Sequence, residues 1–166
     1  MNKITNIIFV FITSSVFSQS FAPAAGQPGS TAIHMDSSAI VGWATGIEVQ
    51  RGFMDISNPG LGAASCGLDQ FALGQAWGDG ITVVSLGDGG VVTLTFPGMI
   101  YNGEGPDFAV FENGFADNYM EFAHVEVSSD GINFFRFPSI SETPLNDQLS
   151  NFSFGDCRYV HNLAGK

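Results

Sequence analysis

Basic residues are scarce in this chain. Its 166 residues include 5 lysines and arginines against 16 aspartates and glutamates, a formal net charge of −11. Proteins that bind nucleic acid or anionic membrane surfaces use lysine and arginine to neutralise phosphate. The composition therefore argues against both as partners and is compatible with divalent cations and with neutral ligands such as sugars. Solubility outside the cell would account for the same charge.

Cysteine and histidine are also few. The two cysteines, Cys66 and Cys157, and the three histidines show no spacing typical of a zinc site. In an oxidising compartment the two cysteines could form a disulfide, and two separate buried thiols are the alternative. The sequence leaves this choice open.

Long apolar runs are missing, since the run Ile7–Ile12 is far shorter than the roughly 20 residues that span a bilayer. It follows the basic residue Lys3 and precedes small residues, a pattern typical of a secretory signal peptide. We expect residues 1–18 to be that peptide, with cleavage between Ser18 and Gln19. The mature protein is then secreted or displayed at the cell surface.

No segment has a convincing amphipathic helical pattern, and glycine is abundant, with 21 residues. Residues 19–32 are rich in Pro, Ala, Gly and Ser and are expected to form an N-terminal arm, and 33–166 are long enough for one domain with its own core. Short β-type segments at near-regular spacing predict an all-β fold, an antiparallel β-sandwich, with 16 phenylalanines available for its core.

Five strands are predicted from alternating or β-branched segments bounded by turn residues. Gly87–Gly90 would join the first two as a hairpin, and the Asp-Gly pair at Asp130 would join the last two. The predicted strands are 81–86, 91–96, 108–112, 121–128 and 132–137.

Glu112 ends one predicted strand and Glu121 begins the next, with only the loop 113–120 between them. In an antiparallel pair the two glutamates would face each other, and like charges directly opposite are destabilising. With so few lysines and arginines available, a calcium ion is the favoured partner, because calcium binds carboxylate, amide and carbonyl oxygens. The spacing is not that of an EF-hand, and the alternative is a solvated turn. The candidate ligands are Asp107, Glu112, Asn113, Asp117 and Glu121.

Three aromatic residues are candidates for stacking on a ligand such as a sugar ring: Tyr119, Tyr101 and Trp77. Tyr119 is the most interesting of them because it lies in the acidic loop, whereas ordinary core packing is the alternative for aromatics flanked by glycine. Trp43, set among Ile40, Val41 and Ile47, is expected in the core.

Other polar residues are expected to have structural roles. Asp88 and Asp130 each precede glycine in a tight turn, where aspartate hydrogen-bonds nearby backbone. Arg51 and Arg136 are scarce cations in an acidic chain, so each should pair with a carboxylate.

Catalysis is not expected. The Gly-x-Ser-x-Gly motif of many serine hydrolases is missing. Glycosidases place two carboxylates roughly 5–10 Å apart on either side of a cleft. Glu112 and Glu121 would instead lie at strand ends beside a loop, so a glycoside hydrolase is the less favoured alternative.

Several runs resemble a family of exported Bacteroidetes cell-surface proteins, many of which carry a C-terminal sorting domain for type IX secretion. The most specific is Asp-Phe-x-Val-Phe-Glu-Asn at 107–113. The other matching runs are 29–33, 43–46, 51–52, 84–90, 102–106, 125–131 and 162–166.

The resemblance implies a jelly-roll sandwich similar to galactose-binding and discoidin-like modules, with no established catalytic activity. In such proteins the domain continues past a segment like 162–166 and a sorting tail follows, so the chain is expected to be incomplete at its C-terminus. More distant relatives resemble surface lipoproteins encoded beside cobalamin-uptake systems, which makes corrinoid capture an alternative. The favoured function is a non-catalytic adhesive or glycan-binding module braced by calcium; its ligand and oligomeric state cannot be read from the sequence.

Overall fold

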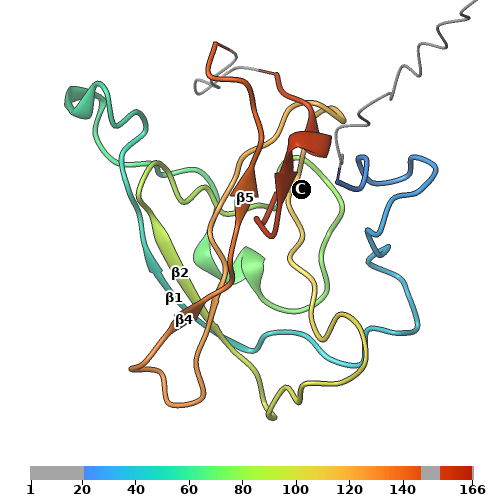
Figure 1. Ribbon diagram of the computed structural model, residues 1–166. Helices are drawn as coiled ribbons and strands as arrows, with labels where there is room; N and C mark the ends of the chain where they lie inside the picture. Colours follow the sequence, from blue (N-terminus) through green and yellow to red (C-terminus); the bar gives the residue numbers. More distant parts are fainter. Residues whose placement is uncertain (1–20, 147–153, 166) are drawn as a thin grey trace, which may run out of the picture.

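The structure, a computed structural model, describes residues 21–146 and 154–165, so the expected signal peptide at 1–18 lies outside the described residues (Figure 1). Three antiparallel strand pairs and three short 3-10 turns are joined by long irregular segments. None of the helical turns in the described ranges could cross a membrane. The strands are β1 Gly46–Gln50, β2 Val91–Thr95, β3 Glu126–Val127, β4 Phe135–Arg136, β5 Ile140–Ser141 and β6 Val160–His161. The 3-10 turns are η1 Pro59–Leu61, η2 Asp69–Ala72 and η3 Cys157–Tyr159.

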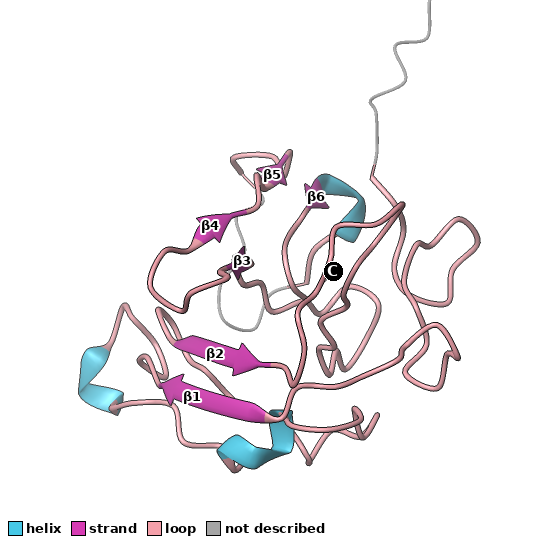
Figure 2. Cartoon of the chain, turned by 90° about the horizontal axis from the view of Figure 1, so that it is seen from below, coloured by secondary structure: helices cyan, strands magenta, loops and turns pink. Residues whose placement is uncertain are grey.

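The longest ladder joins β1 and β2 over five residue pairs (Figure 2). Ile47 lies opposite Leu94, and Val49 lies opposite Val92. Because side chains alternate along a strand, these four apolar residues share one face, where cross-strand pairs stabilise the sheet. Outside the two strands, η2 lies against β1.

The predicted hairpin between 81–86 and 91–96 is wrong, because β2 pairs with β1 and residues 81–86 form no strand. The glycine-rich turn is present, but it bonds the segment after β1 and does not close a hairpin. Within it, Asp88 exchanges two backbone hydrogen bonds with Phe53, at 3.1 and 2.8 Å. Gly67 approaches Val83 so closely that an added Cβ would lie 1.6 Å from its carbonyl oxygen. Alternation within a segment shows that it is β-like and does not identify its partner.

The turn predicted at Asp130 is confirmed, since it connects the paired strands β3 and β4. Asp130 Oδ1 accepts hydrogen bonds from the backbone N–H groups of Ile132 (2.9 Å) and Asn133 (2.8 Å). The Asn133 side-chain amide donates to Oδ2 at 2.7 Å. These bonds to the charged form, the largest from Asn133, hold the pKa of Asp130 far below its usual range.

Arg51, directly after β1, joins three chain segments. Its Nη1 donates to the carbonyl oxygens of Cys66 (2.7 Å) and Ser85 (2.9 Å). Its Nη2 donates to the Gly67 carbonyl (2.9 Å) and forms an ion pair with Asp69 (2.7 Å). The expectation that Arg51 pairs with a carboxylate is confirmed, and the guanidinium also satisfies three backbone acceptors.

The apolar core of the described residues is small. Its buried members are Ala44, Ala64, Cys157 and Val160. None of the phenylalanines in the described ranges is fully buried, and Phe115 and Phe135 are 73% and 72% exposed. The short strand pairs do not show the two stacked sheets of the expected jelly-roll sandwich, which stays a prediction.

Candidate functional site

Glu112 and Glu121 interact, although not through a strand ladder. Neither residue lies in a strand, and the bridge inside the intervening loop joins Ala116 to Tyr119. Partial desolvation, with the negative charge of Glu121 as the second cause, raises the pKa of Glu112, while a hydrogen bond from the Gly114 N–H opposes this rise. The predicted charge repulsion is therefore present without the predicted register.

The closing segment of the described chain lies against this acidic pair. Ala164 and Ala123 exchange backbone hydrogen bonds of 2.9 and 3.2 Å. Gly165, with φ of +87°, lies so close that an added Cβ would be 1.8 Å from the Glu121 carbonyl oxygen and 3.6 Å from Glu112 Cγ. Glycine therefore suits position 165 both sterically and conformationally. The close packing of Gly165 covers one side of Glu112.

The other expected calcium ligands are engaged differently. Asp107 accepts a hydrogen bond from the Gly103 N–H at 2.8 Å. Asp117 accepts one from the Gln27 side-chain amide at 2.7 Å, whereas Asn113, next to Glu112, is half-buried. Within the described ranges, no group of three or more His, Cys, Asp or Glu side chains is placed to hold a metal ion. The structure thus brings together two of the four expected carboxylates.

The three expected ligand-binding aromatics have different surroundings. Tyr119 packs edge-on between Phe115 and Phe154, with ring centroids 5.6 and 5.7 Å apart. Trp77 and Tyr101 are open to solvent, at 63% and 75% exposed. Tyr119 therefore belongs to an aromatic cluster, while the other two are largely exposed to solvent.

Two adjoining hollows lie beside this aromatic cluster. The larger, of about 650 Å³, runs between the N-terminal arm and η3, and its polar side chains include Gln27, Asp117 and Arg158. The smaller, of about 280 Å³, is lined by the aromatic residues Phe154 and Tyr159 together with Thr143 and Pro144. Both are lined by Asn118, Gly155 and Asp156. We call the two hollows together the groove.

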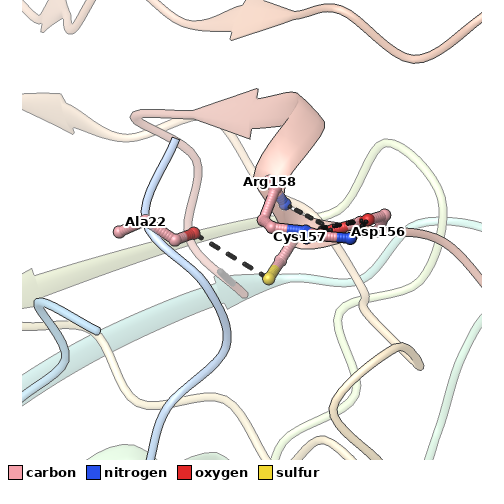
Figure 3. Close-up of polar contacts among 4 residues, drawn as sticks. All are labelled: Ala22, Asp156, Cys157 and Arg158. Atoms are coloured by element: carbon pink, nitrogen blue, oxygen red, sulfur yellow. Dashed lines mark hydrogen bonds and ion pairs between the residues drawn. The ribbon is translucent and has the colours of Figure 1, made fainter. Parts of the chain in front are cut away.

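An ion pair lines the groove where the two hollows adjoin. Arg158 Nε lies 2.9 and 3.0 Å from the two carboxylate oxygens of Asp156, and Nη2 donates to Oδ2 (Figure 3). The side-chain hydrogen bond is the main reason why the pKa of Asp156 is lowered and that of Arg158 is raised. Asp156 Oδ1 also accepts the Arg158 N–H at 2.9 Å, which caps η3.

The sequence analysis did not identify Gln27, Asp156 or Arg158 as site residues. The one signal available for Arg158 was the rarity of cations, which had already singled out Arg51 and Arg136. Nothing in the sequence places Gln27 beside Asp117, which is 90 positions away.

The two cysteines are held apart. Cys66 is exposed, whereas Cys157 is buried and lines the groove. The Cys157 thiol donates to the Ala22 carbonyl over 3.9 Å (Figure 3). No disulfide joins the two residues in this structure.

Comparisons of the chain with known protein families, with curated proteins and with solved structures find no match.

Proposed function

We propose that this protein is a non-catalytic extracellular binding module that recognises a neutral glycan in the groove. The observation that carries the proposal is the chemistry of the lining at Asn118, where the two hollows meet. The larger hollow adds the Gln27 amide, the Asp117 carboxylate and the Arg158 guanidinium to this lining, and the smaller hollow adds the rings of Phe154 and Tyr159. Sugars present hydroxyl groups and apolar C–H faces, so they need both kinds of partner.

The polar part of the groove offers donors and acceptors in planar groups. The amides of Gln27 and Asn118 each supply both, and the carboxylate of Asp117 accepts. Phe154, 62% exposed, and Tyr159 provide apolar ring faces. A few placed polar groups beside apolar surface are typical of small-molecule sites.

Calcium is the second part of the proposal. Glu112 and Glu121 would supply two carboxylates, and the Asn113 amide and backbone carbonyls would complete the oxygen shell. The raised pKa of Glu112 supports this assignment, because an adjacent cation would relieve both the desolvation and the repulsion. A bound ion would fix the loop 113–120, which carries Tyr119 and Asn118.

Export and surface display complete the proposal. They are supported by the signal-peptide pattern of residues 1–18 and by the resemblance to exported Bacteroidetes surface proteins. The excess of acidic residues also favours a neutral ligand over an anionic one.

A panel of immobilised neutral oligosaccharides tests the function, with the wild-type chain, Asn118→Ala and the control Asn102→Ala compared on it. Asn118 lines both hollows, whereas Asn102 is exposed and lines neither. We expect the wild type to bind at least one glycan, and Asn118→Ala to bind it about 10-fold more weakly, the effect of losing one net hydrogen bond. The control should stay within about twofold of the wild type.

Three outcomes would contradict the proposal: no binding to any glycan, equal binding by Asn118→Ala, or turnover of chromogenic glycosides. A visible-absorbance change on mixing with cobalamin, without glycan binding, would favour the corrinoid alternative instead.

A further inference from the structure

The N-terminal arm lies across the C-terminal part of the chain. The Phe21 N–H donates to the Arg158 carbonyl at 2.9 Å. The Phe21 ring stacks on His161 with a centroid distance of 4.8 Å and an interplanar angle of 9°. Further along, the Ala22 carbonyl accepts the Cys157 thiol. These contacts place the arm beside η3 and β6, more than 130 positions away in sequence.

Farther along, the Gln27 side chain contacts the opposite wall. Gln27 Nε2 donates to Asp117 Oδ2 at 2.7 Å across the larger hollow. Within the arm, the backbone N–H groups of Gln27 and Ser30 bond the carbonyls three residues before them. Residues 25–29 are exposed, and the arm belongs to none of the three strand pairs. Exposed segments that lie outside the regular strand pairs can open before the whole protein unfolds.

The arm covers a thiol as well as a hollow. Pro23, Ala24, Gln27 and Pro28 form one wall of the larger hollow, and Cys157 lies on the opposite wall at 5% exposed. Figure 3 shows the thiol pointing toward the arm at Ala22. If the arm moves away, the hollow loses a wall and the thiol becomes accessible.

We propose that residues 21–30 of the N-terminal arm form a strap that closes the larger hollow and opens independently of global unfolding, exposing Cys157 when it does. This inference goes beyond glycan binding, because it requires no ligand. Opening of the strap would let a ligand enter the groove. Closing of the strap would complete the wall of the groove at Gln27.

Thiol alkylation of the full chain tests the strap, with each cysteine followed separately by peptide mass spectrometry. The exposed Cys66 reports the rate of an accessible thiol in the same molecule. The strap variants are Phe21→Ala, which removes the ring stacked on His161, and Gln27→Ala. The control variant is Gln75→Ala, because the Gln75 amide donates to Asp36, six residues beyond the strap, in a matching exposed contact of 2.8 Å that does not involve residues 21–30.

We expect wild-type Cys157 to react much more slowly than Cys66. Each strap variant should raise the Cys157 rate at least about 10-fold, with the Cys66 rate and the urea midpoint nearly unchanged, because local opening leaves the rest of the fold intact. Gln75→Ala should leave both rates unchanged. An unchanged Cys157 rate in both strap variants would overturn the proposal.

The wild type provides a second test that does not depend on how the variants fold. The Cys157 rate is measured at several urea concentrations below the unfolding transition. Local opening exposes little surface and should give a shallow urea dependence, whereas exposure through global unfolding follows the full equilibrium slope. The full slope would also overturn the proposal.

Discussion

Glu112 is the residue at which partial desolvation and a neighbouring like charge act together against ionisation. Its raised pKa means that the folded state favours the protonated carboxyl more than the unfolded state does. The stability that this protonation contributes is fully present below the unfolded pKa, near 4.3, and is lost as pH rises through the higher folded pKa. Ionisation of Glu112 therefore lowers the stability of the folded state, and either a proton or a bound cation would remove this destabilisation.

Replacing the Glu112 carboxylate by its neutral isostere distinguishes the effect of protonation from the effect of a bound cation. In chelator at neutral pH, Glu112→Gln should be at least as stable as the wild type, because the amide carries no charge and can still accept the Gly114 N–H. With calcium at about 100 times its dissociation constant, the wild type should gain about 2.7 kcal/mol, and the variant much less. Thermal melts with and without calcium measure both effects.

The pH dependence provides the control for this comparison. In chelator, the difference between variant and wild type should shrink as pH falls through the raised pKa of Glu112, because the wild-type carboxyl then becomes protonated. A variant that is less stable by the same amount with and without calcium would show that the glutamate has a purely structural role.

At the scale of elements, a side-chain hub joins β1 to the irregular segments around it. Arg51 bonds three backbone carbonyls and Asp69, and its side chain is only 20% exposed. Arg136 offers a contrast, since it forms an ion pair with Glu126 across β3 and β4 at 2.7 Å with a 56% exposed side chain. Both pairings with carboxylates were predicted, but the carbonyl contacts of Arg51 were not.

Alanine substitution should destabilise the protein more at Arg51 than at Arg136. Arg51→Ala should lower the free energy of unfolding by about 2–3 kcal/mol, because it leaves partly buried carbonyls without donors. Arg136→Ala should cost less than about 1 kcal/mol, as is usual for an exposed ion pair. Urea unfolding midpoints measure the difference, and equal losses would contradict the role of Arg51 as a hub.

At the scale of the whole molecule, excess negative charge and a small core act in the same direction. The net charge of −11 produces self-repulsion that opposes compaction. No large side chain of the described residues is fully buried, so little apolar burial offsets this repulsion. Stability should therefore respond to ionic strength.

Screening by salt should stabilise the protein. Raising NaCl from about 0.01 M to about 0.1 M shortens the Debye length from about 30 Å to about 10 Å. We expect the melting temperature to rise by about 2–4 °C, which corresponds to about 1 kcal/mol for a chain of this size. CaCl₂ at matched ionic strength is the companion measurement, and any additional rise reports specific calcium binding. A melting temperature that falls with salt would contradict the self-repulsion argument.

Local chemistry accounts for the features that the sequence predicted correctly. The Asp130 turn forms because its carboxylate bonds the next backbone N–H groups, within three residues. Glu112 and Glu121 interact because a loop of only eight residues separates them. The scarcity of cations likewise indicated that arginines would be paired, as Arg51 and Arg136 are. Each of these features depends on composition or on neighbours in the chain.

Long-range partners were decided only by the tertiary structure. β2 pairs with β1 rather than with the preceding β-like segment, because alternation indicates which face a side chain occupies and not which strand lies alongside. Gln27 meets Asp117, and Ala22 meets Cys157, across 90 and 135 positions. Such contacts require distant segments to converge, and no local pattern in the sequence specifies that convergence.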